Sequence, residues 1–280
     1  MQLCQPLPLK SGSSKVHLKS VTYTPLKADG TCRTATDIVA AVKKMKAVGI
    51  SNIRTYNQNC NQLATLLKAI KANGGGMTVL TGVYIDGSMN DNVEIATLKS
   101  VLTKKKNTKY IRGILVGNEL VFNQIMSSTD LIKKIKTVKA IAKGYKVGTS
   151  EIFTSYTKDL MNASDIIAVN LHPFFSQVKI EDAMKNLSDQ YKNFIKLTGG
   201  KKVYISETGW PSAGNDYGAA HPSVANMKKF ATLLAKSNLP YYYFEWEDSA
   251  WKHPGAYGIE PHWGLLDTNG KAKFSLNGLK

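Results

Sequence analysis

Short apolar runs alternate with longer amphipathic segments along almost the whole of this sequence. The apolar runs, rich in β-branched and aromatic residues, predict strands at 17–23, 52–56, 77–84, 111–116, 146–149, 166–170, 202–206 and 241–246. Between them, apolar residues at i, i+3 and i+4 predict helices at 35–48, 59–72, 91–106, 128–143, 156–163, 178–197 and 222–236. Strands that alternate with helices of this length indicate parallel βαβ units throughout the chain.

Two architectures produce this alternation, a closed α/β barrel and an open doubly wound sheet. The open sheet usually has about five or six strands and a glycine-rich phosphate loop after the first strand, and the sequence has neither. A (β/α)8 barrel usually takes about 250 residues, which suits a chain of 280 residues. We therefore predict an α/β fold, a single (β/α)8 TIM barrel domain over residues 1–280, with 1–16 as an N-terminal extension. No clear eighth helix follows the last predicted strand.

The chain carries a formal net charge of +17, which is typical of nucleic-acid binders, of proteins that meet anionic polymers, and of lysine-rich solvated surfaces. Lysine runs such as Lys43-Lys44 and Lys133-Lys134 fall in amphipathic segments, where they face solvent. No zinc-finger or RNP motif accompanies them, so we predict no nucleic-acid partner. No apolar run reaches the roughly 18 residues of a membrane span. The cysteines are not spaced as a metal site, and no metal or cofactor is predicted.

A glutamate follows directly on the fourth and on the seventh predicted strand. Glu119 comes after the run GILVGN, and Glu207 comes after VYIS. Active sites of such barrels lie where the strands end, and a carboxylate buried there costs free energy unless it is paired. One such glutamate could be a structural partner of Arg or Lys, whereas two of them indicate a catalytic pair. Carboxylates about 5–5.5 Å apart are typical of retaining glycosidases, and their repulsion separates the two pKa values.

Sequence motifs in order along the chain resemble glycoside hydrolase family 17, the β-1,3-glucan-active family, and in particular its fungal cell-wall branch. The matching pieces are ADGTC near residue 30, IRTYNQNCN at 53–61, GILVGNEL at 113–120, ISETGWPS at 205–212, FEWEDSAWK, and EPHWGLLD. The resemblance implies that Glu119 is the general acid/base and Glu207 the nucleophile. It also implies no extra subdomain of the plant type, because the stretch 171–201 is barely long enough for one helix.

The resemblance implies a retaining enzyme that works by double displacement, a β-1,3-glucanosyltransferase with endo-β-1,3-glucanase activity. Two alternatives stay open, a purely hydrolytic endo-β-1,3-glucanase and a non-catalytic barrel that binds glucan. The expected partners are β-1,3-glucan and its oligosaccharides, and the expected state is a monomer. A secreted or cell-wall location is inferred from the family, although the N-terminus lacks the continuous apolar stretch of a signal peptide.

Side chains at or just beyond the predicted strand ends are candidates for substrate contact or for support of the glutamates. They are Asn118, Tyr23, Arg54, Tyr56, Tyr84, His172, Phe174, Trp210, Glu245, Asp248 and Lys252. Asn118 is expected to bond a sugar 2-hydroxyl or to cap its strand, and Arg54 to keep a carboxylate ionised. His172 is expected to bond Glu207 or to be structural. Trp210 is expected to stack on a glucose ring or to plug the barrel.

The last predicted strand departs from the pattern of the family it resembles. Family members often carry Asp-Glu before the Trp-Lys pair, whereas here Asp248 is followed by Ser249. This change puts the usual polar network at that wall in doubt. Glu245, Glu247 and Lys252 are candidates to replace part of it, and Glu260 could pair with Lys252.

Two of the three cysteines, Cys32 and Cys60, follow the first and the second predicted strand. Loops after neighbouring strands can approach within disulfide range. We predict a Cys32–Cys60 bridge, which implies an oxidising compartment, and a free Cys4.

Overall fold

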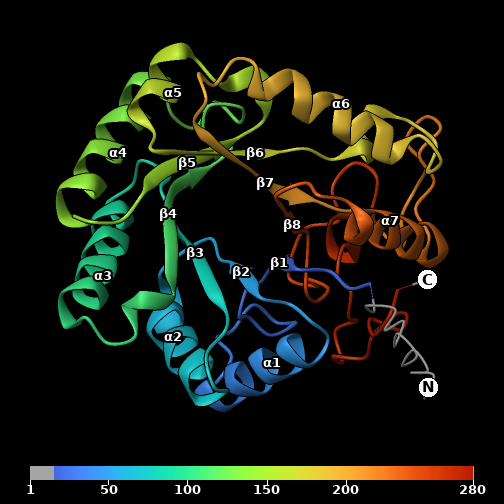
Figure 1. The fold of residues 1–280 in the computed structure, drawn as a ribbon, viewed down its shortest axis with the longest axis horizontal. Coiled ribbons are helices and arrows are strands. Elements are labelled where there is room, and N and C mark those ends of the chain that lie inside the picture. Colours follow the sequence, from blue (N-terminus) through green and yellow to red (C-terminus); the bar gives the residue numbers. More distant parts are fainter. Residues whose placement is uncertain (1–15, 280) are drawn as a thin grey trace, which may run out of the picture.

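The computed structural model describes residues 16–279, which form a closed barrel of parallel strands paired in chain order from β1 to β8 (Figure 1). The strands are β1 Ser20–Thr22, β2 Asn52–Arg54, β3 Thr78–Val83, β4 Ile111–Asn118, β5 Val147–Glu151, β6 Ile166–Asn170, β7 Lys202–Thr208 and β8 Tyr241–Tyr243. The helices around them are α1 Ala35–Ala47, α2 Gln62–Ala72, α3 Asn90–Lys104, α4 Ser128–Ile141, α5 Lys158–Ala163, α6 Ala183–Ile195 and α7 Val224–Lys236. The predicted (β/α)8 barrel is confirmed. The predicted N-terminal extension and the predicted free Cys4 lie outside the described residues.

Capping residues and apolar stripes explain where the helices lie. Thr34 caps α1 in a reciprocal capping box with Asp37, and the Ser127 side chain accepts the backbone N–H of Asp130 at the start of α4. Each of these helices turns a buried stripe toward the strands, for example Ile38, Val42 and Met45 in α1. Lys43 and Lys44 of α1 face solvent as predicted, and so does Lys133 of α4. Lys134 is half-buried and pairs with Asp91.

Apolar side chains fill the barrel on both sides of the strand ring. Inside the ring lies a cluster of six residues, Leu80, Leu115, Ile166, Ala168, Tyr204 and Tyr242. A larger cluster fills the space between strands and helices. The lower part of the barrel is therefore a packed core rather than a pore. Polar side chains such as Arg54 and Ser206 occupy the strands nearer their carboxyl ends, where the site lies.

Most elements begin or end a few residues from their predicted bounds, and three of them illustrate the difference. The first strand is limited to Ser20–Thr22 and the last to Tyr241–Tyr243. Beyond Tyr243 the regular ladder ends. The backbone N–H groups of Phe244 and Trp246 still bond Thr208 of β7 and Thr22 of β1, but that of Glu245 bonds the carbonyl of Trp263 in the loop that follows. The helix predicted at 178–197 is Ala183–Ile195. The residues just before it form a turn that the backbone N–H of Asp182 closes on the carbonyl of Lys179.

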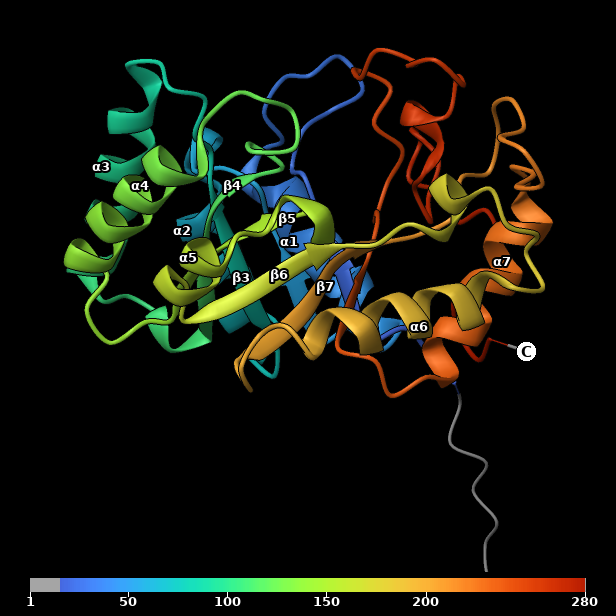
Figure 2. The same ribbon diagram turned by 90° about the horizontal axis from the view of Figure 1, so that it is seen from above.

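In place of an eighth helix, an irregular segment closes the ring between α7 and α1 (Figure 1). Within it the structure has only a 3₁₀ turn, Glu260–His262, among the described residues after β8. Leu276 and Leu279 pack against Leu18 and Ile50 at the base of the barrel. Loops that follow β1, β4 and β8 rise on one side of the barrel (Figure 2), and together they form the walls of the cleft described below.

Within residues 16–279, no helix combines the length and the apolar character needed to cross a membrane. The same part of the chain contains no group of three or more His, Cys, Asp or Glu side chains that could hold a metal ion.

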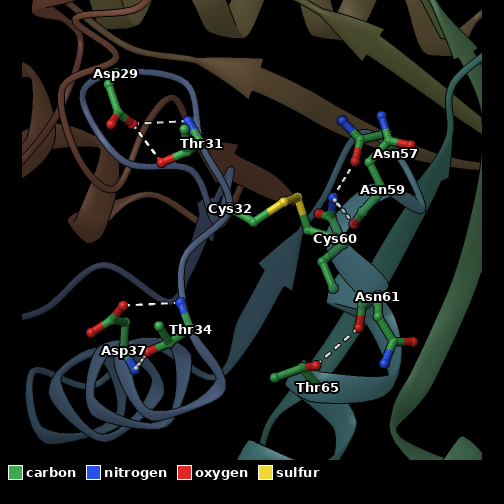
Figure 3. Close-up of a disulfide and its surroundings, with 11 residues drawn as sticks. Asp29, Thr31, Cys32, Thr34, Asp37, Asn57, Asn59, Cys60, Asn61 and Thr65 are labelled. Atoms are coloured by element: carbon green, nitrogen blue, oxygen red, sulfur yellow. Dashed lines mark hydrogen bonds between the residues drawn. A yellow bond between two sulfur atoms is a disulfide. The ribbon is translucent and has the colours of Figure 1, made fainter.

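A disulfide joins Cys32, in the loop after β1, to Cys60, in the turn after β2 (Figure 3). The bridge closes a sequence separation of 28 residues and fixes two loops that border the cleft. Closing a loop of this length lowers the conformational entropy of the unfolded chain, which stabilises the folded state by about 3.5 kcal/mol.

Replacing both cysteines by serine should therefore lower the free energy of unfolding by about 3.5 kcal/mol. Urea unfolding of the double variant, with Cys4→Ser as the control that removes a thiol but no bridge, measures the loss. Reductant should reproduce the loss in the parent protein and change nothing in the double variant. Equal stability of parent and double variant would show that the bridge does not stabilise the fold.

Candidate active site

Polar side chains from four strands meet at the carboxyl end of the barrel. The guanidinium of Arg54, at the end of β2, crosses the barrel: Nη1 lies 2.7 Å from Glu207 Oε1 on β7, and Nη2 lies 2.7 Å from Asn118 Oδ1 on β4. The Asn170 amide, at the end of β6, donates to Asn118 Oδ1 at 3.1 Å and to Glu119 Oε1 at 2.8 Å. One hydrogen-bonded network thus connects both predicted catalytic glutamates.

The environment of Glu207 favours its ionised form. The side chain is buried, and burial alone would raise its pKa. The charge of Arg54 outweighs that effect and, with His172, lowers the pKa of Glu207 to about 2. His172 Nε2 lies 3.5 Å from Glu207 Oε2, on the other carboxylate oxygen from Arg54. Arg54 was expected to keep a carboxylate ionised and His172 to bond Glu207. The contacts of both residues with the Glu207 carboxylate match these predictions.

The environment of Glu119 favours its protonated form. Burial raises the pKa of Glu119, and the negative charge of Glu207 raises it further, although the hydrogen bond from Asn170 opposes both. The two carboxylates therefore have pKa values displaced in opposite directions, the arrangement that separates an acid from an ionised partner in one site.

The backbone before Glu119 turns sharply at the end of β4. Gly117 has φ of +74° and Glu119 itself has φ of +55°, a region that a non-glycine residue enters at a cost of about 1–2 kcal/mol. A Cβ at position 117 would also lie 2.4 Å from Leu120 Cδ1, so the positive φ and the close contact together favour glycine there. The turn places Glu119 in the cleft.

The two glutamates lie where two halves of an open cleft meet. One half, of about 520 Å³, and the other, of about 570 Å³, share Glu119, Glu207, Phe244 and Glu260. Rings line both halves: Phe122, Phe153 and Phe175 in the first, and Tyr56, Tyr84 and Trp251 in the second. Trp263 also borders the first half but is buried. Flat aromatic faces on both sides of a carboxylate pair suit an extended chain of sugar rings.

His172 has a structural contact as well as its contact with Glu207. Its ring packs edge-on against Trp263 and Phe244, with centroids 5.0 and 5.6 Å apart. These rings hold the imidazole beside the carboxylate, so the two roles considered for His172 are combined in one residue.

Four predicted contact residues do not reach the cleft. Trp210 and Phe174 are fully buried and pack against each other at 5.5 Å, and the Trp210 indole N–H donates to the carbonyl of His221. Tyr23 is also buried. The prediction of sugar contact is therefore wrong for all three, because rings without exposed faces cannot stack on a sugar. The burial of Trp210 fits the alternative considered for it, a structural plug. The prediction for Asp248 is wrong too, since its carboxylate accepts hydrogen bonds from Lys273 Nζ at 2.7 Å and from the backbone N–H of Gly264.

The wall after β8 is rebuilt around Glu245. This buried carboxylate accepts from Lys252 Nζ at 3.0 Å and from Ser249 Oγ at 3.1 Å. Burial raises the pKa of Glu245, and Lys252 opposes the rise. Lys252 pairs with Glu245 rather than with Glu260, and Glu247 pairs with Arg33 outside the cleft. Family members often have a glutamate at the position of Ser249. In this chain the Ser249 hydroxyl takes part in the network instead, by donating to Glu245.

Asn170 is the most informative residue that the sequence reasoning missed. It ends an apolar strand in the same way as Asn118 and Glu207, and this polar strand end was a usable signal. Its Oδ1 accepts from Ser150 and Ser206, at 3.0 and 2.8 Å, which orients the amide N–H groups toward Glu119. Trp251, which lines the cleft, and Trp263, which packs against His172, were missed as well, because no periodic pattern marks an aromatic residue in an irregular loop.

A barrel whose strand ends present an ionised carboxylate and a second carboxylate of raised pKa in one cleft has the architecture of a glycoside hydrolase. The sequence profile of the BtgE/BtgC glycoside hydrolase domain matches residues 20–264. The chain belongs to this family, within glycoside hydrolase family 17.

Named relatives and solved structures agree with this membership. The probable family 17 glucosidase SCW10 of Saccharomyces cerevisiae is 31% identical over 90% of this chain and 65% of its own length. The probable beta-glucosidase btgE of Aspergillus fumigatus is 30% identical over 89% and 45%. The chain thus spans 65% of the length of the first relative and 45% of the length of the second.

Among solved structures, an active-site mutant of a β-1,3-glucanosyltransferase from Rhizomucor miehei, in complex with laminaritriose, superimposes with a TM-score of 0.82 and 25% identity. The match covers 94% of this chain and 98% of that one. An endo-laminarinase from Formosa has the same fold, with a TM-score of 0.77.

Proposed function

We propose that this chain is a retaining enzyme acting on β-1,3-glucan, a glucanosyltransferase with endo-β-1,3-glucanase activity. The observation that carries the proposal is the opposite displacement of two pKa values in one cleft: that of Glu207 is lowered to about 2 and that of Glu119 is raised. The similarity in length and fold to the Rhizomucor miehei glucanosyltransferase, which was solved with laminaritriose, supports the substrate class.

The proposed reaction is a double displacement. The ionised Glu207 carboxylate attacks the anomeric carbon while Glu119 protonates the leaving glycosidic oxygen. A glucosyl ester on Glu207 results, and the aglycone departs as an alcohol. Glu119, now ionised, takes a proton from the acceptor hydroxyl, whose oxygen attacks the anomeric carbon and releases Glu207. Retention of the β configuration follows from the two inversions.

Asn118 is placed to hold the sugar in this reaction. Within the described part of the chain, the side-chain hydrogen bonds of Asn118 come from Arg54 and Asn170, and both fall on Oδ1. The amide N–H groups of Asn118 are therefore available to donate to a ligand. Asn118 lines the cleft beside Glu119. We assign them to the 2-hydroxyl of the glucose bound at Glu207, a bond that strengthens as positive charge develops on the ring.

The shape of the cleft supports transfer in addition to hydrolysis. Aromatic residues line it on both sides of the carboxylates, so an acceptor sugar can be held against the competing water. The disulfide between Cys32 and Cys60 supports action in an oxidising compartment, and we propose that the enzyme is secreted and works at the cell wall.

Incubation with purified laminarihexaose at high concentration tests the proposal. Products longer than the hexamer, detected by mass spectrometry over time, are expected alongside shorter ones. Shorter products alone would identify a purely hydrolytic endo-β-1,3-glucanase. An unchanged hexamer that still binds the protein would identify a non-catalytic glucan-binding barrel.

A further inference from the structure

Another buried carboxylate lies behind the loop that carries Glu119. Glu151 ends β5 and is completely buried. Its Oε1 accepts the backbone N–H of Val121 at 2.9 Å, and its Oε2 accepts that of Phe122 at 3.2 Å. None of the ion pairs found in the described part of the chain includes Glu151. Hydrogen bonds from the backbone N–H groups of one loop, rather than a cation, thus offset the cost of burying this carboxylate.

The loop that Glu151 holds has a strained backbone. Glu119 has φ of +55°, and Gln124, at the far side of the same turn, has φ of +57°. Strained backbone persists only where the surroundings over-determine it. At the start of the turn, the backbone N–H of Glu119 bonds the carbonyl of Ser150. Glu151, which follows Ser150 in β5, then binds the backbone N–H groups of Val121 and Phe122, two and three residues after Glu119.

Two titratable side chains face Glu151. Glu119 approaches from the end of β4, and Tyr156 from the turn after β5, with its hydroxyl donating to the carbonyls of Thr149 and Ala168. Burial raises the pKa of Glu151 to about 7, against the backbone hydrogen bonds that favour its charged form, and Glu119 raises it slightly further. Burying a carboxylate here costs folding free energy. We therefore explain the presence of Glu151 by the turn that it holds rather than by a contribution to the stability of the fold.

We propose that Glu151 is a positioning residue for the general acid: by binding the N–H groups of Val121 and Phe122, it holds the left-handed turn that points Glu119 at the leaving oxygen. This inference rests on the proposed function, since it requires Glu119 to protonate a leaving group. Glu151 itself lines neither half of the cleft and touches no sugar.

The dependence of the rate on the leaving group tests this role. The glycosidic oxygen of laminarihexaose needs a proton to depart, whereas 2,4-dinitrophenolate departs without one. In Glu151→Gln one acceptor oxygen becomes an N–H donor that faces backbone N–H groups. This variant should lose about tenfold to a hundredfold of kcat/KM on laminarihexaose, because a misplaced acid forfeits part of its usual 10²–10⁴-fold contribution. It should lose less than about threefold on 2,4-dinitrophenyl β-laminaribioside.

A matched control exists one loop away. Glu94 is also buried and accepts two backbone N–H groups, those of Gln58 and Tyr84, at 2.7 and 2.9 Å, but it does not hold the Glu119 turn. Glu94→Gln should change kcat/KM on the two substrates by the same factor, as should any variant that is partly unfolded. Glu119→Ala gives the full leaving-group dependence for comparison.

The outcomes separate the inference from the proposed function. If Glu119→Ala shows the dependence and Glu151→Gln affects both substrates equally, Glu151 is merely structural and the inference is overturned. A parent protein that turns over neither substrate would overturn the proposed function and the inference with it. A selective loss in Glu151→Gln, absent from Glu94→Gln, would establish the positioning role.

Discussion

Glu207→Gln should abolish turnover of β-1,3-glucan while binding persists. The amide keeps the size of the side chain and can still accept a hydrogen bond from Arg54, but it cannot form the covalent ester. Loss of a covalent nucleophile is expected to lower kcat by roughly 10⁴-fold or more. Turnover of laminarihexaose measures the loss, and isothermal titration with the same oligosaccharide measures binding.

An exposed glutamate provides the control for this experiment. Glu181 pairs with Lys229 on the surface, and Glu181→Gln should leave both turnover and binding unchanged. Glu207→Gln that hydrolyses glucan at the parent rate would assign the nucleophile elsewhere. A variant that neither binds nor turns over would call for a circular-dichroism check before any conclusion on chemistry.

Arg54→Met should damage both the stability and the acid tolerance of the enzyme. Arg54 is 1% exposed and pairs with the buried Glu207. Breaking such a pair leaves an uncompensated buried charge, which costs about 3–5 kcal/mol. The pKa of Glu207 should rise from about 2 toward and beyond its ordinary value of 4.5, because burial then acts without the opposing charge of Arg54.

The sign of the pH effect follows from the lowered pKa. In the parent, Glu207 is ionised above about pH 2, so the Arg54–Glu207 pair stabilises the fold above the unfolded pKa and is lost as the pH falls toward 2. The acidic limb of kcat/KM should therefore move to higher pH in Arg54→Met. Chemical denaturation at several pH values, together with the pH profile of kcat/KM, measures both effects.

Arg33 offers a matched arginine–glutamate pair outside the cleft. It pairs with Glu247 in a more exposed place, with 21% and 15% of the two side chains exposed. Arg33→Met should cost less than about 1 kcal/mol and leave the acidic limb in place. If Arg54→Met behaves in the same way as Arg33→Met, the charge of Arg54 is not what keeps Glu207 ionised.

The sequence by itself determined the barrel and the two carboxylates. Strand and helix signals depend on periods of two and 3.6 residues, which are local properties of a chain. Eight strands alternating with helices leave few ways to close the sheet. Because parallel strands end at the same face, Glu119 and Glu207 could be placed together without knowing any distance.

Only the tertiary structure decided which neighbours support the glutamates and which face a ligand. Arg54 reaches Glu207 across the barrel from a position 153 residues away, and no local pattern encodes that contact. Trp210, Phe174 and Tyr23 look like sugar-binding residues in sequence, but helices and loops from elsewhere in the chain cover them. Glu151 was not recognised at all, because its role depends on the backbone of a loop thirty residues earlier. Burial and pKa are set by all the groups around a side chain, and these come together only when the chain has folded.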